Sequence, residues 1–100
     1  MTLFPGVRPI HGDSVHLGVG TDTLHITGDV VCQVVYQSGR GYFELTLPDD
    51  DPEQRRSLER HGQYVVELYR AGESLYVSPP LTLISTRRTS TGALVLRGAP

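Results

Sequence analysis

Histidine and aspartate residues gather in the first quarter of the chain, where they could ligate a metal ion. His11 and Asp13 flank a glycine, and His16 and His25 follow. Imidazole and carboxylate groups are ligands that suit zinc or iron. However, their spacing matches no closed metal-binding motif, and His or Asp beside a glycine is typical of turns. We therefore predict no metal site and no cofactor.

The single cysteine is the other residue with reactive chemistry. Cys32 could act as a nucleophile with His16 or His61 as its base, but it lies within the apolar run from Val30 to Gln37. A thiol in such a run is usually an inert part of the core. With one cysteine no internal disulfide can form. We predict that the protein is not an enzyme.

An acidic run could bind calcium, which prefers several oxygen ligands in a flexible loop. Asp49 to Asp51 are followed by Glu53, but the glycine and the distal glutamate of a known calcium loop are absent. Helix capping explains these residues better: Asp51 can cap a helix, and Pro52 suits the first helical position. We predict one short helix within the segment from Pro48 to Gly62.

The remaining elements that must position these side chains are strands. Apolar and polar residues alternate with period two, and Gly-rich turns separate the runs. Pro79 and Pro80 should interrupt the sheet, because proline donates no hydrogen bond. The pattern predicts seven or eight short strands in an all-β, two-sheet sandwich; a small β-barrel is the alternative. The expected strands are 14–20, 23–27, 30–37, 42–47, 63–70, 75–77, 81–86 and 93–97, with a turn at Gly28 and Asp29.

The stretch from His61 to Ser85 resembles the late strands of immunoglobulin-like and fibronectin type III-like β-sandwich domains. The resemblance rests on GQYVVELY, the following Gly72, and SPPLTL. It implies that Tyr64 begins a strand after a corner, and that its hydroxyl hydrogen-bonds back to that corner. The paired cysteines and the central tryptophan of antibody domains are absent, which excludes a close relative of them.

Length and charge limit the possible functions. The chain has 100 residues and a formal net charge of −2. That length suits one domain with a single core, and the mild negative charge does not favour nucleic acid or an anionic membrane. The first residues lack the basic and apolar regions of a signal peptide. We therefore expect synthesis in the cytoplasm, with a virion or a cytoplasmic assembly as the destination.

Residues 1–13 are predicted to form an extended N-terminal arm, and residues 14–100 a single domain. The arm shows no periodicity and contains two prolines, yet Phe4, Val7 and Ile10 are too apolar for a solvated tail. The arm can pack on its own domain or lie across a neighbouring subunit by adding to an exposed sheet edge. The sequence leaves both alternatives open.

Tyrosine and arginine side chains are expected on strand faces opposite the core. This composition is typical of protein contact sites and also of surfaces that stack single-stranded bases. We predict a non-enzymatic structural or assembly module that contacts copies of itself or a larger assembly, such as a phage head, tail or decoration protein. The alternative is a small barrel that binds single-stranded nucleic acid or carbohydrate. The predicted contact residues are Phe4, Val7, Ile10, Tyr42, Tyr69, Arg70 and Tyr76.

Overall fold

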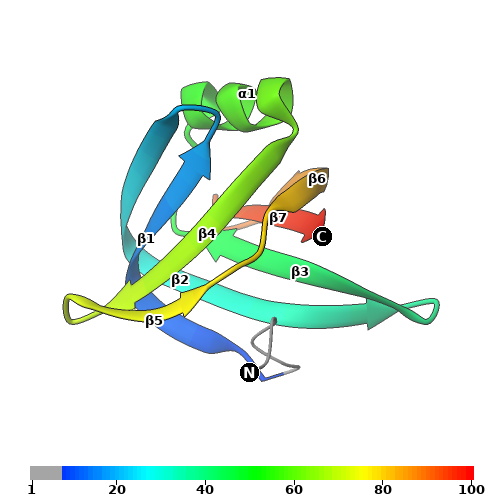
Figure 1. Cartoon of the computed structure of the whole chain (residues 1–100), viewed down its shortest axis with the longest axis horizontal. Helices are drawn as coiled ribbons and strands as arrows, with labels where there is room; N and C mark the ends of the chain where they lie inside the picture. Colours follow the sequence, from blue (N-terminus) through cyan, green and yellow to red (C-terminus); the bar gives the residue numbers. More distant parts are fainter. Residues whose placement is uncertain (1–7) are drawn as a thin grey trace.

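Seven strands and one helix make up residues 8–100, the part of the chain that the computed structural model describes (Figure 1). Their bounds are β1 Ile10–Val19, β2 Asp22–Gln37, β3 Arg40–Leu47, α1 Pro52–His61, β4 Gln63–Arg70, β5 Glu73–Val77, β6 Leu81–Arg88 and β7 Leu94–Ala99. The predicted all-β class with one short helix is confirmed. The strands are short, except for β2, which has 16 residues.

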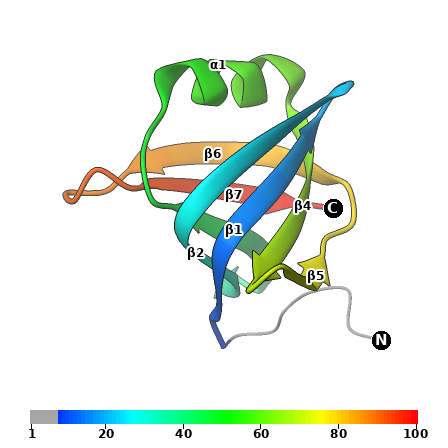
Figure 2. The ribbon, with the colours of Figure 1, turned by 90° about the vertical axis from the view of Figure 1, so that its left-hand side faces the viewer.

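The strands form one antiparallel sheet whose pairings return to their starting point. The order is β1-β2-β3-β7-β6-β4-β5, and β4 also pairs with β1. Ser14 pairs with Thr27 of β2 and with Tyr69 of β4, so these two strands flank opposite edges of β1. Figure 2 shows β1, β2 and β4 side by side, with β6 and β7 running across behind them. Six strands therefore make a ring of pairings, to which β5 is added.

Two strands share one edge of β4. Its first two residues pair with β6, and its last four pair with β5. Pro79 and Pro80 separate these two strands, as predicted, because neither proline can donate to the ladder. Ser78 secures the junction: its backbone N–H donates to the Val66 carbonyl, and its Oγ accepts from the Val66 N–H, both at 2.8 Å.

Strand β2 continues, with a β-bulge, through Gly28 and Asp29, where a turn was predicted. Gly28 and Asp29 lie opposite one residue of β1, Asp13, where the register of the two strands shifts. Such a bulge bends the strand without ending it. Gly28 has a φ of 125°, and a Cβ there would lie 3.0 Å from Pro48, so only glycine fits without strain. The prediction of two strands separated by a turn was wrong at this point.

The first strand begins inside the segment that was predicted to be an extended arm. Ile10 pairs with Cys32, and its side chain packs partly buried against the core. Asp13 also belongs to β1, and its Oδ2 accepts a hydrogen bond of 2.8 Å from the Ala71 N–H. Residues 10–13 therefore belong to the sheet, because β2 offers them a pairing edge. The predicted arm residues Phe4 and Val7 lie outside the described residues.

Alternate strand residues form one buried core, as the period-two pattern predicted. Tyr36 is an exception: it was expected on the buried face of β2 but is 66% exposed. The reason is that the β2–β3 hairpin projects beyond the body of the sheet (Figure 1). The buried cluster comprises Val15, Leu17, Val19, Val30, Cys32, Phe43, Leu45, Leu47, Leu58, Tyr64, Val66, Leu68, Leu81, Leu94 and Leu96.

Helix α1 lies over one end of the sheet and is capped at both of its ends (Figure 1). The Asp51 carboxylate accepts hydrogen bonds from the N–H groups of Glu53 at 2.9 Å and Gln54 at 3.5 Å. Gly62 adopts a φ of 73°, and its N–H donates to the Leu58 carbonyl at 2.9 Å. Leu58 is the helix residue that reaches the core. The predicted helix start at Asp51 and Pro52 is confirmed, and the helix lies within the predicted segment from Pro48 to Gly62.

Tyr64 follows the helix directly, but its hydroxyl does not make the predicted corner hydrogen bond. The side chain is 2% exposed, and its Oη has no hydrogen-bond partner among residues 8–100. Instead, the hydroxyl packs against Gly98 of β7. The expected bond to the corner was wrong because the ring points into the core rather than back toward α1.

Candidate functional site

A row of aromatic side chains crosses the outer face of the sheet from β2 to β4. His16 lies directly opposite His25, and their ring centroids are 4.1 Å apart. The Tyr69 ring lies 4.5 Å from His16 on the other side. His16 points outward because its neighbours Val15 and Leu17 point into the core. We call His25, His16 and Tyr69 the aromatic row.

The tight turn between β1 and β2 determines which histidines meet. Val19 pairs with Asp22, so only Gly20 and Thr21 form the turn. Gly20 has a φ of 62°, which glycine adopts without steric cost. Counting back along both strands from this turn places His16 opposite His25. The two-residue turn is a signal present in the sequence, but the expected strand bounds, 14–20 and 23–27, do not specify which residues pair.

Glu67 places a negative charge beside the aromatic row. It pairs with His16 across β1 and β4. Its carboxylate accepts a 2.7 Å hydrogen bond from the Ser74 hydroxyl. This bond, together with one from the Tyr69 hydroxyl, lowers the pKa of Glu67, and the same contact raises the pKa of Tyr69. The carboxylate is therefore ionised at neutral pH, and two neighbours hold it in position.

Two adjoining depressions open along the outer surface of β1 and β4. They have volumes of about 300 Å³ and about 220 Å³ and share Gly18 and Val65. We call them together the β1–β4 groove. One end lies beside the aromatic row and the other lies near the start of β4. The remaining lining residues are His16, Gly20, Thr23, Gln63, Tyr64, Glu67, Val77 and Pro80.

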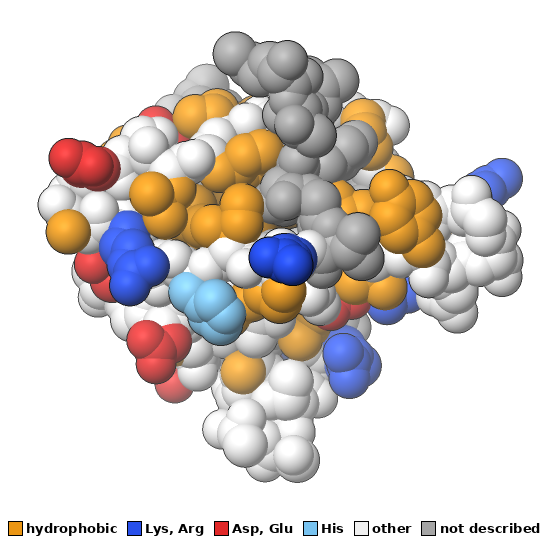
Figure 3. All heavy atoms as spheres, turned by 90° about the horizontal axis from the view of Figure 1, so that it is seen from below, with side chains coloured by type: hydrophobic (Ala, Val, Ile, Leu, Met, Phe, Trp, Pro, Cys, Tyr) orange, Lys and Arg blue, Asp and Glu red, His pale blue; other side chains and the backbone are white. Residues whose placement is uncertain are grey.

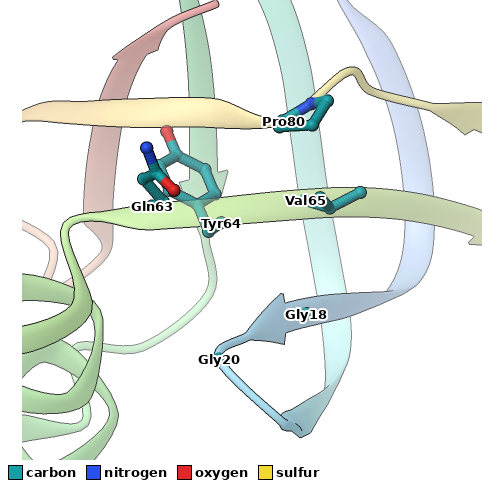
Figure 4. Close-up of a pocket in the computed structure, with 6 residues that line it drawn as sticks. All are labelled: Gly18, Gly20, Gln63, Tyr64, Val65 and Pro80. Atoms are coloured by element: carbon teal, nitrogen blue, oxygen red, sulfur yellow. The ribbon is translucent and has the colours of Figure 1, made fainter.

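Two glycines, Gly18 of β1 and Gly20 of the turn that follows it, create the floor of the groove. Figure 4 shows Gly18 and Gly20 facing Val65 across the depression, while the ring of Tyr64 is directed away from both glycines. A Cβ at Gly18 would meet Val65 at 3.9 Å, an ordinary contact. The fold therefore does not require glycine at position 18. A larger side chain there would fill the groove.

Tyr42 belongs to a separate network across β2, β3 and β7. Arg97 donates to Gln37 at 2.8 Å and to Glu44 at 3.1 Å, and its guanidinium lies 5.3 Å from the centre of the Tyr42 ring. Tyr42 is half-buried on the outer face of β3, as predicted. Its ring is already engaged by Arg97 through a cation–π contact. It is not part of the aromatic row.

Tyr76 was predicted to face outward, and this prediction was wrong. It pairs with the buried residue Leu68, so both side chains point inward. Its ring stacks on Phe43 with centroids 5.9 Å apart, and burial raises its pKa to about 12. Its two neighbours in β5, Leu75 and Val77, are exposed instead. A bulge between Leu68 and Tyr69 shifts the register, and the alternation within β5 alone does not reveal this shift.

The predicted contact residues do not form one surface. Tyr69 belongs to the aromatic row, whereas Arg70 lies exposed at the end of β4. Tyr42 lies on β3, which does not pair with β4. Ile10 packs on the core. Of the described members of the predicted set, only Tyr69 lies beside a groove.

Cys32 has the environment of a core thiol. It is fully buried and free, and burial raises its pKa to about 12. His16, its suggested partner, lies on the opposite, outer face of the sheet. A protonated thiol on the inner face of the sheet cannot act as a nucleophile toward a molecule that approaches from solvent.

The acidic run before α1 is used within the protein. Asp51 caps the helix, and the Asp50 carboxylate is 3.3 Å from the Arg55 guanidinium, with only 6% of the aspartate side chain exposed. A depression of about 490 Å³ lies beside Glu53, Arg56 and Arg60 on α1. Among residues 8–100, no group of three or more His, Cys, Asp or Glu side chains is placed to hold a metal ion.

Comparisons with known proteins give no relative for this chain. No family model, no curated protein and no solved structure matches it. The immunoglobulin-like resemblance therefore stays a prediction. Within residues 8–100, no helix has the length and apolar character needed to cross a membrane.

Proposed function

We propose that this chain is a non-enzymatic structural module that assembles through contacts with copies of itself. The proposal rests on three exposed apolar side chains, two on β5 and one on β6. Leu75 is 44% exposed, Val77 is 56% exposed and Ile84 is 53% exposed. We call these three residues the apolar strip. Exposed apolar groups of this kind typically mark protein contact surfaces.

The position of Leu75 and Val77 on β5 supports this proposal. β5 lies toward the lower side of the molecule in Figure 1, and hydrophobic side chains gather on the face seen from below in Figure 3. Tyr36, 66% exposed on the projecting β2–β3 hairpin, adds a large aromatic group to the exposed apolar residues. Tyrosine is among the residues enriched in protein interfaces.

The energy available from the apolar strip favours an assembly of many copies over an isolated dimer. Covering a half-exposed Leu, Ile or Val contributes roughly 1 kcal/mol. A two-fold contact would use each residue twice and gain roughly 6 kcal/mol, while association costs about 4–15 kcal/mol. Such a dimer would be weak. Within a larger assembly, such as a virion, many such weak contacts form together, and their combined strength would hold the copies in place.

For the architecture, we favour the small closed barrel over the two-sheet sandwich. The support is the β1–β4 pairing, which joins the two ends of the six-strand order β1-β2-β3-β7-β6-β4. In such a barrel Leu75 and Val77 would lie on the outside wall. The core would then fill the interior, as in small barrels generally.

The oligomeric state tests the assembly proposal. We expect the full chain to form oligomers at high concentration in sedimentation velocity experiments, and the double variant Leu75→Ser, Val77→Ser to stay monomeric. A matched control is Thr82→Ser, an exposed substitution on β6 outside the apolar strip, which should assemble like the natural chain. A natural chain that remains monomeric at every concentration would refute the proposal.

A second candidate function rests on the aromatic row and the β1–β4 groove. Aromatic rings beside a groove with a fixed carboxylate are suited to stacking and hydrogen-bonding a sugar. The charge of Glu67 disfavours the phosphates of single-stranded nucleic acid, the other ligand considered. Titration with neutral oligosaccharides and, at low salt, with oligonucleotides separates the two ligands. Gly18→Val should fill the groove and weaken binding, and binding unaffected by this change would exclude the groove.

A further inference from the structure

The two histidines of the aromatic row have an arrangement that stacking alone does not require. His16 and His25 occupy directly opposite positions on paired antiparallel strands. Their ring centroids are 4.1 Å apart, and the ring planes are tilted by 59°. His25 is exposed and His16 is half-buried, so both rings can be reached from solvent.

We propose that His16 and His25 together bind one divalent transition-metal ion of the copper, nickel or zinc class. Each histidine would supply one imidazole nitrogen, and water molecules would complete the coordination. Imidazole is a preferred ligand for these ions. Two ligands fixed on neighbouring strands bind more tightly than two independent histidines, because the second contact is intramolecular.

The surroundings favour a cation at this position. Glu67 pairs with His16 on the β4 side and places a carboxylate beside it. Ser74 and Tyr69 hold this carboxylate by hydrogen bonds, so it contributes charge beside the site rather than a ligand. The Tyr69 ring packs on His16 and limits its motion.

The number of protein ligands determines the character of the site. Among the described residues no third His, Cys, Asp or Glu side chain joins the two histidines. Structural zinc sites use four protein ligands, so this site is open and holds an exchangeable ion. Copper(II) and nickel(II) accept nitrogen and water ligands in square or tetragonal geometry and should bind more tightly than manganese(II).

The experiment titrates the full chain with nickel chloride. Calorimetry measures the affinity and stoichiometry, and two-dimensional NMR of the backbone amides locates the ion through paramagnetic broadening. We expect one ion for each chain, with broadening centred on residues near 16 and 25. His16→Gln and His25→Gln should each weaken binding by about tenfold or more, because one ligand alone remains.

His11→Gln is the matched control, since His11 is an exposed histidine on the same strand that faces Val31 rather than another histidine. It should bind nickel like the natural chain. NMR spectra without metal show whether each variant remains folded. The proposal fails if the natural chain binds no nickel at millimolar concentration, or if His16→Gln and His25→Gln bind as tightly as the natural chain. It also fails if His11→Gln weakens binding as strongly as they do. None of these results depends on whether the chain assembles through the apolar strip.

Discussion

The hydroxyl of Tyr64 occupies the space in which a Cβ on Gly98 would lie. The two residues belong to β4 and β7, which do not pair with each other, so they meet across the interior of the ring. The hydroxyl is buried without a hydrogen-bond partner among the described residues. Burial also raises the pKa of Tyr64, because the ionised form would be poorly solvated. The close approach of these two residues makes their substitutions interdependent.

Gly98→Ala should destabilise the fold by about 1–3 kcal/mol, because the added methyl group overpacks the core. Chemical denaturation measures this loss. Gly18→Ala is the matched control, since its Cβ would make only an ordinary contact, 3.9 Å from Val65. Equal stability of Gly98→Ala and Gly18→Ala would contradict the packing of Tyr64 on Gly98.

Tyr64→Phe should be neutral or stabilising, because it removes a buried hydroxyl that lacks a partner. This is the opposite sign from the expectation based on a corner hydrogen bond. The same change should reduce the cost of Gly98→Ala, because it vacates the space that the methyl group needs. A double-mutant cycle measures this coupling, and purely additive free energies of unfolding would count against it.

The Cys32 thiol should resist chemical modification in the folded protein. Its buried position raises its pKa to about 12, so very little thiolate exists near pH 8. The rate at which Cys32 reacts can be measured with a disulfide reagent that releases a coloured thiol. We expect slow reaction in the native protein and prompt reaction in denaturant. Native reaction at the rate of an exposed cysteine would show that the core opens readily.

Asp51→Ala should lower the stability by about 1 kcal/mol through loss of the helix cap. Asp49→Ala, which removes an exposed carboxylate of the same run, serves as the control and should have little effect. Thermal and chemical denaturation compare the two variants. If both lose the same stability, the general charge of the acidic run matters more than the cap.

Ser74→Ala should raise the pKa of Glu67 toward its ordinary value, because it removes the hydrogen bond that contributes most to lowering it. Carboxyl NMR titration measures this directly. A carboxyl with a lowered folded-state pKa stabilises the fold above its unfolded-state pKa, and this contribution disappears as the pH falls through the folded-state value. The stability difference between the natural chain and Ser74→Ala should therefore vanish in acid. An unchanged Glu67 titration would exclude this hydrogen bond.

The local elements could be predicted from the sequence because their causes are local. Val15 and Leu17 alternate with polar or small residues, and this period-two pattern correctly predicted a strand with one buried face. Asp51, Pro52 and Gly62 define the helix ends through contacts within a few residues. The break at Pro79 and Pro80 follows from the missing N–H of proline. Each of these features can be predicted from residues that are close together in the sequence.

The remaining features depend on pairings between distant parts of the chain. Gly28 carries a bulge rather than a turn because Asp13 and Pro48 shape its surroundings. Tyr76 points inward because its register with Leu68 follows another bulge. The β1–β4 groove requires the pairing that closes the ring, which no local pattern specifies. These contacts determined which predicted site residues could come together.

The proline break between β5 and β6 has a consequence for how the sheet opens. β5 can separate from the end of β4 without disturbing any hydrogen bond between β6 and β7, because Ser78 anchors the chain before the prolines. Backbone amides of β5 should therefore exchange with deuterium through a small local fluctuation, whereas those of β7 should require global unfolding. Such an opening would withdraw Tyr76 from Phe43 but would leave the hydrogen bonds between β6 and β7 in place.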